Sequence, residues 1–154
     1  MNQMRIIKHI SYRTDDNQYR KAGIILEKKI EQYDVVIIGG GAAGLTAAIY
    51  CGRARLKTLV IEKALVGGLA TYTNEIENYP GFPEGSTGLG LMELFHKQAK
   101  KFGVKFKLTD VRAVQLKGDK KVVETFRTDY ECRSVIIASG GKPRLTGAPG
   151  EDKF

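Results

Sequence analysis

Three glycines, Gly39, Gly41 and Gly44, follow the spacing Gly-x-Gly-x-x-Gly at the end of an apolar, β-branched run. In this motif the first glycine permits a tight strand-to-helix turn, and the second lets the main chain approach a pyrophosphate without a Cβ in the way. The third lets the helix pack closely on the strand. The helix start, here Ala42 and Ala43, offers free N–H groups and a positive dipole end to the anion. The pattern therefore predicts the binding of a dinucleotide.

Glu62 is a further residue that could do chemistry, because it lies eighteen residues after Gly44 at the end of a second apolar run. A carboxylate there can accept hydrogen bonds from the two hydroxyls of an adenosine ribose, and it would repel the 2′-phosphate of NADP. The alternative is a glycine-rich turn of purely structural purpose, with a solvated glutamate at a strand end. The strand, the glycine spacing, the helix and the acidic residue together favour a dinucleotide, but they do not distinguish NAD from FAD.

The elements that must position these residues form a βαβ unit. The continuous apolar run Asp34–Gly39 predicts a parallel strand buried on both faces, Ala42–Ala54 predicts a helix, and Lys57–Glu62 predicts a second buried strand. Their crossover should be right-handed. The loop that follows, Lys63–Gly88, is rich in Gly, Pro, Asn and Thr, and a connection of this length is usually functional.

The rest of the chain completes an α/β domain. Leu89–Gly103 predicts an amphipathic helix that ends at a C′ glycine, and Val104–Leu108 predicts a third parallel strand. Two alternating segments around Lys117–Lys121 predict an antiparallel hairpin, and Ser134–Ser139 predicts a last buried strand. The expected fold is therefore Rossmann-like, with a parallel sheet and an inserted antiparallel β-hairpin. We assign it to residues 33–154.

Residues 1–32 are expected to be an amino-terminal extension whose role the sequence does not reveal. They carry no chemical motif. Residues 15–32 could form a short amphipathic helix with an apolar patch made of Ile24, Ile25, Leu26 and Ile30.

Composition narrows the class of protein. The 154 residues are 42% hydrophobic and 27% charged, as in a globular domain, with no run near the ~20 apolar residues that cross a bilayer and no secretory signal pattern. The cytoplasm is the default compartment. The net charge of +8 is spread along the chain without interleaved aromatic residues, which argues against nucleic acid. Cys51 and Cys132 are isolated and His96 has no partner, so we assign no metal site and no catalytic residue.

Two further stretches resemble the low-molecular-weight thioredoxin reductases. Val66–Phe82, with its Glu-Asn-Tyr-Pro-Gly sequence, is similar to the flavin-contacting loop of that family, and Val135–Glu151 is similar to its Ile-Ile-Ala-Thr-Gly strand and the turn after it. The resemblance covers Tyr33 to Glu151. It implies that the dinucleotide is FAD and that the domain is the FAD-binding portion only.

The resemblance also implies roles for the site residues. The three glycines with Ala42 and Ala43 would hold the pyrophosphate, and Glu62 the adenosine ribose. Leu69 stands where the family usually has Gln, and Ser139 replaces the common Thr. The remaining cofactor-binding residues are expected at the flavin end (Gly67, Gly68, Leu69, Thr71, Asn78) and on the adenylate side (Ser139, Gly140).

The function that the resemblance implies belongs to a longer enzyme. In the family, a hydride passes from NADPH to FAD, and electrons then pass to a protein disulfide of a thioredoxin-like partner through a Cys-x-x-Cys. Neither that motif nor an NADPH domain is present in these 154 residues. We therefore expect the chain alone to be inactive. The alternative is a self-contained FAD-binding module without a catalytic cycle, which could assemble as a homodimer. A peroxiredoxin reductase or a ferredoxin-dependent relative stays open as a third reading.

Overall fold

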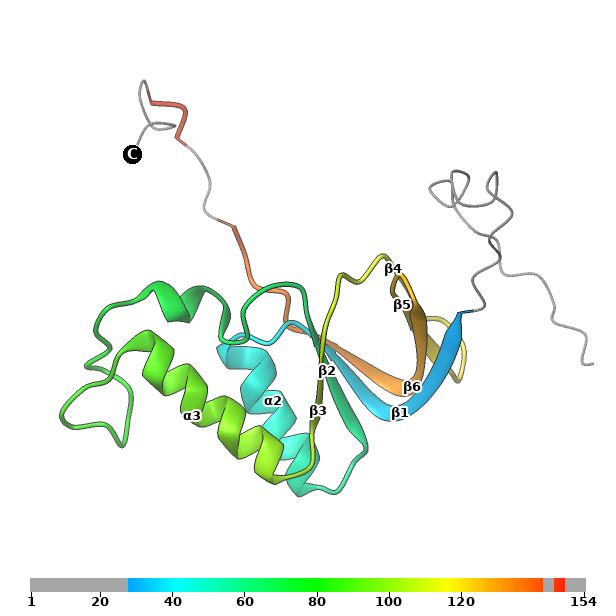
Figure 1. The fold of residues 1–154 in the computed structure, drawn as a ribbon, viewed down its shortest axis with the longest axis horizontal. Helices are drawn as coiled ribbons and strands as arrows, with labels where there is room; N and C mark the ends of the chain where they lie inside the picture. The colour runs from blue at the N-terminus through cyan, green and yellow to red at the C-terminus, as the bar shows by residue number, and fades with distance from the viewer. Residues whose placement is uncertain (1–27, 143–145, 149–154) are drawn as a thin grey trace, which may run out of the picture.

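A computed structural model describes residues 28–142 and 146–148, and in it one six-stranded sheet carries two helices (Figure 1). The strand order is β3-β2-β1-β6-β5-β4. Strands and helices have the following bounds: β1 Lys29–Ile38, α2 Ala42–Arg53, β2 Thr58–Glu62, the 3₁₀ turn η1 Gly68–Tyr72, α3 Gly88–Lys101, β3 Lys105–Leu108, β4 Ala113–Gln115, β5 Lys121–Glu124 and β6 Thr128–Ile137.

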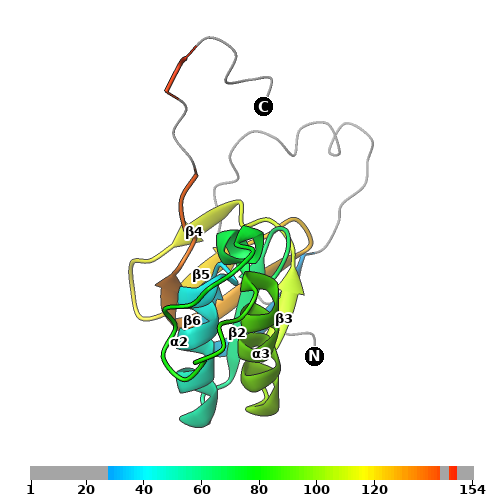
Figure 2. The ribbon, with the colours of Figure 1, turned by 90° about the vertical axis from the view of Figure 1, so that its left-hand side faces the viewer.

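The parallel half of the sheet is the one predicted from the sequence. β1 lies between β2 and β6, with Ile38 opposite Ile61 on one side and Ile137 on the other, and β3 pairs with β2. Figure 2 shows α2 and α3 side by side on one face of this sheet. The predicted Rossmann-like arrangement and the inserted antiparallel hairpin, β4–β5, are both present.

Two layers of core side chains hold the sheet. On the helix side, Val35, Ile37 and Val60 pack with residues of α2 and α3. On the other side, Val36, Leu59 and Ile61 pack with Val123 of β5 and with two residues of β6, so the hairpin strands close over this face; the β6 residues are Tyr130 and Cys132. Each fully buried aliphatic side chain stabilises the fold by about 1.5–3 kcal/mol.

β6 is longer than predicted. It starts at Thr128, pairs with β1 along both strands, and pairs with β5 in its first half. Cys132 therefore lies inside β6, whereas the sequence prediction placed it before the last strand. The pairing of β1 with β6 skips Asp34, and the N–H groups of Asp34 and Val35 both donate to the carbonyl of Lys57, at 2.9 and 3.3 Å. The register of β1 against β6 is the same before and after Asp34, so β1 continues through this residue.

The helix expected over residues 15–32 is wrong for Lys29–Gln32, because these residues belong to β1. They pair with Thr128–Glu131, about a hundred residues later in the chain. Residues 15–27 of that prediction lie outside the described residues.

The limits of α3 follow the predicted signals. The Thr87 hydroxyl caps the helix by accepting a hydrogen bond from the Gly90 N–H at 3.0 Å, and Gly103 follows the helix with φ of +80°. These two features set where α3 begins and ends.

His96 of α3 packs its ring edge-on against Phe106, with ring centroids 4.4 Å apart, and its Nε2 is buried without a hydrogen-bond partner among the described residues. Burial, and then the neighbouring Lys100, lowers the pKa of His96. Because protonation is harder in the folded state, the contribution of His96 to stability is complete above the unfolded pKa of about 6.5. It is lost as the pH falls below that value and through the lower pKa of the folded state.

We expect the free energy of unfolding to fall between pH 7.5 and pH 5.5, and to fall less in His96→Phe, which keeps a ring of similar size. Urea unfolding at the two pH values measures the difference. Equal losses in both proteins would contradict the assignment of this pH dependence to His96.

Candidate functional site

The junction between β1 and α2 needs glycine at two of its three motif positions for the fold itself. Gly39 has φ of +104°, and a Cβ there would overlap the carbonyl oxygen of Ala138 in the chain after β6. A Cβ on the buried Gly44 would overlap the carbonyl oxygen of Gly39. These two glycines let strand, turn and helix approach one another, as the motif predicts.

Gly41 differs from both. It is the N-cap of α2, with φ of −75° and ψ of −173°, which any residue can adopt. A Cβ there would have Gly67 O at 3.8 Å and Gly68 Cα at 3.9 Å as its nearest neighbours, which is ordinary contact. The fold thus gives no steric reason for glycine at this position. An unfilled space beside a helix start fits a bound anion that comes close to the main chain.

The long loop docks onto the junction through Gly67 and Gly68. The Gly67 N–H donates to the carbonyl of Gly40 at 2.7 Å, and Gly67 forms an isolated parallel bridge with Gly41. A Cβ on Gly68 would lie 3.1 Å from the Cα of Gly41. The Thr71 hydroxyl donates to the carbonyl of Gly68 at 2.8 Å, which closes the 3₁₀ turn.

Glu62 reaches the same junction from the end of β2. Its Oε2 accepts a hydrogen bond from the Gly40 N–H at 2.7 Å. Its Oε1 accepts from the N–H groups of Lys63 and Ala64, at 2.8 and 3.0 Å. The carboxylate is therefore held in one orientation at the glycine turn. A carboxylate offers about four acceptor positions, so these three bonds leave capacity for a ligand hydroxyl.

The end of β6 forms the third side of the glycine junction, beside the ends of β1 and β2. The Cα of Ser139 lies 3.1 Å from the position of a Cβ on Gly39, and Gly140 follows with φ of +69°. Both residues are exposed. The carboxyl ends of β1, β2 and β6 thus meet at one place, which is where open α/β sheets bind ligands.

Asn78 and Leu69 are not gathered in the same way. Asn78 is exposed in a turn that packs onto α3, with the Tyr79 ring 5.5 Å from Phe95 and 5.8 Å from Phe82. The stretch Glu77–Pro83 lines a shallow hollow of about 510 Å³. Leu69, in the 3₁₀ turn, is 56% exposed.

Sequence reasoning missed Gly40, which occupies an unspecified position of the motif. It is buried, and its N–H and carbonyl connect the junction to Glu62 and to Gly67. A Cβ there would lie 3.3 Å from the Cβ of Glu62. The run of three consecutive glycines, Gly39–Gly41, was the available signal.

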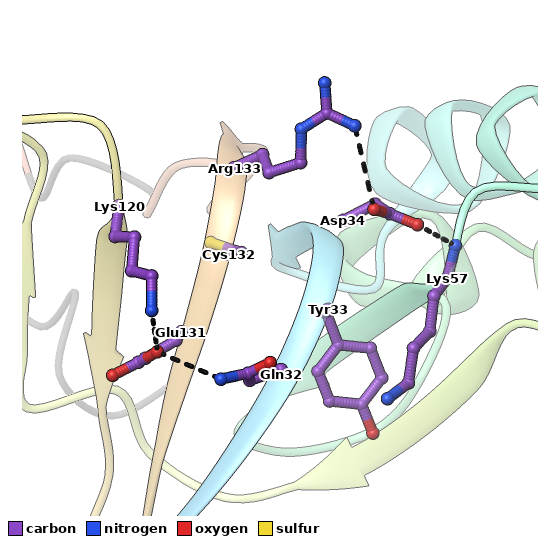
Figure 3. A pocket seen from close by; sticks show the side chains of 8 residues that line it. All are labelled: Gln32, Tyr33, Asp34, Lys57, Lys120, Glu131, Cys132 and Arg133. Atoms are coloured by element: carbon purple, nitrogen blue, oxygen red, sulfur yellow. Dashed lines mark hydrogen bonds and ion pairs between the residues drawn. The ribbon is translucent and has the colours of Figure 1, made fainter.

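A second cavity, of about 330 Å³, lies beside the middle of β1, around Asp34 and next to Lys57 at the start of β2 (Figure 3). Most of its charges are paired, and the Lys57 ammonium lies over the Tyr33 ring, 4.9 Å from its centroid. Lys120 pairs with Glu131 at 3.1 Å, Arg133 lies 3.9 Å from Asp34, and Asp34 also accepts from the Lys57 N–H. Its lining residues are Gln32, Tyr33, Asp34, Lys57, Lys120, Glu131, Cys132 and Arg133. We therefore place the candidate site at the glycine junction.

The two thiols are poorly suited to redox chemistry. Burial raises the pKa of the Cys51 thiol, in α2, and of the Cys132 thiol, in β6. A raised pKa leaves less of the thiolate that attacks disulfides. Among the described residues, no three His, Cys, Asp or Glu side chains come together as a metal site requires. No helix in the described part of the chain is long and apolar enough to span a bilayer.

The sheet, its two helices and the glycine junction define a Rossmann-like α/β domain. Residues 33–154 match the family model of the pyridine nucleotide-disulphide oxidoreductases, and the chain belongs to this family. The resemblance stated from the sequence is thereby confirmed.

Thioredoxin reductases are prominent among the similar proteins. Thioredoxin reductase from Mycolicibacterium smegmatis is 48% identical over 120 residues, which are 78% of this chain and 39% of the relative. The Bacillus subtilis (strain 168) enzyme is 45% identical over 128 residues, or 83% and 40% of the two chains. The chain therefore spans about two fifths of the length of these relatives.

The solved structures that are similar to this chain are also thioredoxin reductases. The Lactococcus lactis thioredoxin reductase superposes with a TM-score of 0.73 at 40% identity, covering 78% of this chain and 39% of that one. A ferredoxin-flavin thioredoxin reductase from Clostridium acetobutylicum gives a TM-score of 0.66 at 31% identity, over 81% and 43%. These neighbours have the predicted Rossmann-like FAD-binding fold.

Proposed function

We propose that this chain is the FAD-binding portion of a thioredoxin-reductase-like flavoprotein. The observation that carries the proposal is the space at Gly41, which the fold leaves open beside the start of α2 and opposite Gly67–Gly68. The family supplies the cofactor class, and the junction supplies main-chain donors of the kind that bind a diphosphate.

The chain's own residues would bind and orient the cofactor. The N–H groups of Ala42 and Ala43, in the first turn of α2, have no acceptor within the helix and would bind the diphosphate together with the Gly41 main chain. Glu62, already fixed by three backbone donors, would accept a hydroxyl of the adenosine ribose through its remaining acceptor position. Ser139 and Gly140 would cover the adenylate side.

The flavin end would lie toward the long loop. Gly67 and Gly68 would let it approach the main chain, with Leu69, Thr71 and Asn78 along its edge. When bound, the flavin accepts a hydride from a nicotinamide cofactor and passes electrons to a disulfide. In the full-length enzyme we expect NADPH as the hydride donor, a thioredoxin-like protein as the acceptor and the cytoplasm as the compartment.

A second candidate is a self-contained FAD-binding module without a catalytic cycle. The raised pKa of both thiols, Cys51 half-buried in α2 and Cys132 buried in β6, favours it, because these residues do not supply a reactive dithiol near the cofactor. Both candidates require the same FAD site. They differ in whether a longer protein with a Cys-x-x-Cys reduces thioredoxin. An insulin-reduction assay of the protein encoded by the complete coding region would decide between them.

Competition between nucleotides tests the proposed site. We expect ADP, which carries the diphosphate and the ribose, to displace FAD, and FMN, which lacks the adenylate half, to bind at least about tenfold more weakly than FAD. Flavin fluorescence in an FAD titration measures both effects. An equal affinity for FMN and FAD, with no competition by ADP, would contradict the proposal.

Glu62→Gln should weaken FAD binding by about tenfold, because it replaces a charged acceptor of ribose hydroxyls, whose hydrogen bonds are worth about 1.5–3 kcal/mol. FMN affinity should not change. Glu93→Gln is the matched control, since Glu93 is exposed on α3. If the two variants bind FAD equally well, Glu62 has no role in ribose binding.

A further inference from the structure

Gly40 is buried in the junction between β1 and α2, and its backbone conformation does not explain the glycine. Its φ lies outside the left-handed region that glycine favours. A Cβ on Gly39 or Gly44 would overlap a main-chain carbonyl oxygen, whereas the three atoms nearest to a Cβ on Gly40 all belong to the Glu62 side chain. These atoms are Cβ at 3.3 Å, and Cγ and Oε2 at 3.5 Å. The missing side chain at position 40 therefore makes room for the Glu62 carboxylate.

The main chain around Gly40 is held by hydrogen bonds. The Gly40 carbonyl accepts from the Gly67 N–H at 2.7 Å, and the Gly39 N–H donates to the carbonyl of Ile61 at 2.8 Å. A backbone shift could make room for a methyl group at position 40 only if one of these bonds were lengthened. The long, half-buried side chain of Glu62 can change its rotamer more easily. We therefore expect Glu62 to move and the main chain to stay.

A shift of Glu62 would change the geometry of its carboxylate. Oε2 accepts from the Gly40 N–H at 2.7 Å, and Oε1 accepts from the N–H groups of Lys63 and Ala64. These bonds occupy three of about four acceptor positions, so they also set the direction of the position that remains. A hydrogen bond weakens steeply when its donor and acceptor are misaligned. After the shift, the remaining position would thus bind a ligand hydroxyl less well.

We propose that Gly40 is a positioning residue for the adenosine ribose. It makes room for Glu62 and donates to it, and so fixes the acceptor position that is left for a ribose hydroxyl. The effect is confined to the adenosine half of the cofactor, because the bond that joins Gly40 to Gly67 of the long loop is between main-chain atoms and does not change. The inference rests on the proposed function, since it needs Glu62 to bind the ribose.

Calorimetric titration of Gly40→Ala with ADP and with FMN tests the proposal. ADP affinity should fall about tenfold, as expected for the loss of Glu62 as a ribose acceptor, and FMN affinity should change by less than about twofold. Gly118→Ala is the control. Gly118 lies in the turn between β4 and β5 with φ of +86°, so alanine should lower the urea midpoint of unfolding and leave both affinities unchanged. An equal loss for ADP and FMN would overturn the proposal, because it would show a general disturbance of the junction.

A double-mutant cycle with Glu62→Ala shows whether Gly40 acts through Glu62. In that background Gly40→Ala should reduce ADP affinity by less than about twofold, because the Cγ and carboxylate that the methyl group displaces are gone. An equal reduction in both backgrounds would overturn the positioning role. In the ligand-free Gly40→Ala protein, the amide resonances of Lys63 and Ala64 should shift, since both groups donate to Glu62. Unshifted amides would also overturn it.

The Glu62→Gln variant separates this inference from the proposed function. If Glu62→Gln weakens ADP binding and Gly40→Ala does not, the positioning role of Gly40 is wrong and the ribose site stands. If the parent chain does not bind ADP, the proposed site is wrong, and the positioning role with it.

Discussion

Gly41→Ala is expected to weaken FAD binding by about 30-fold, because a methyl group placed in a close-packed contact costs about 2 kcal/mol. The methyl would enter the space beside the start of α2, where the diphosphate is proposed to bind. The folded protein has room for it, since its nearest neighbours would be 3.8 and 3.9 Å away. We therefore expect the free energy of unfolding to change by no more than about 1 kcal/mol, because the gain from a more restricted unfolded chain and the cost of alanine at an N-cap oppose each other.

This prediction separates a ligand effect from a folding effect. FAD titration followed by flavin fluorescence gives the affinity, and urea unfolding of the same sample gives the stability. An unchanged FAD affinity in Gly41→Ala would show that the space is not used by the cofactor. A loss of stability similar to the loss of affinity would show that Gly41 serves the fold.

Gly44→Ala should have the opposite result. Its Cβ would overlap the carbonyl oxygen of Gly39 and lie 3.0 Å from the carbonyl carbon, and main-chain atoms cannot move without shifting α2 away from β1. We expect a loss of about 3 kcal/mol or more in the free energy of unfolding, at the upper end for overpacking a core position. Urea unfolding followed by circular dichroism measures it.

Gly52→Ala is a graded control for this effect. Gly52 is buried in the last turn of the same helix, but the atoms that its Cβ would meet first are side-chain carbons of Phe102 and Val104, at 2.8 and 2.9 Å. These approaches are less close than the overlap of a Gly44 Cβ with the Gly39 carbonyl oxygen, so the destabilisation should be smaller than that of Gly44→Ala. Equal unfolding midpoints for Gly44→Ala and the parent would mean that the helix does not depend on a close approach to the strand.

The elements that local sequence signals specify could be predicted, and those held by distant pairing could not. The βαβ unit follows from apolar runs and glycines within thirty residues of one another, and α3 from its periodicity and its C′ glycine. Lys29–Gln32 has helical spacing, yet it is a strand, because its backbone groups are satisfied by Thr128–Glu131. The early start of β6 was missed for the same reason, since its first half is defined by pairing with β5 and β1.

In the candidate site, too, residues specified by local sequence could be predicted and contacts between distant segments could not. The motif glycines and Glu62 could be identified because the chemistry of a diphosphate and a ribose dictates residue types at fixed spacing. The docking of Gly67 onto Gly40 could not be derived from spacing, because it joins two turns through a main-chain hydrogen bond. Gly40 was missed because its role is a backbone contact to Glu62, which leaves no side-chain signal.

Amide NMR of the isotope-labelled chain during titration with FAD tests the central claim most directly, and a 17.0 kDa protein is suitable for it. The account predicts that the largest shifts occur at the amides of Gly41, Ala42 and Ala43, with smaller ones at Lys63 and Ala64, which donate to Glu62. Saturating FAD that leaves these amides unshifted, or that shifts only the residues lining the cavity around Asp34, would contradict it.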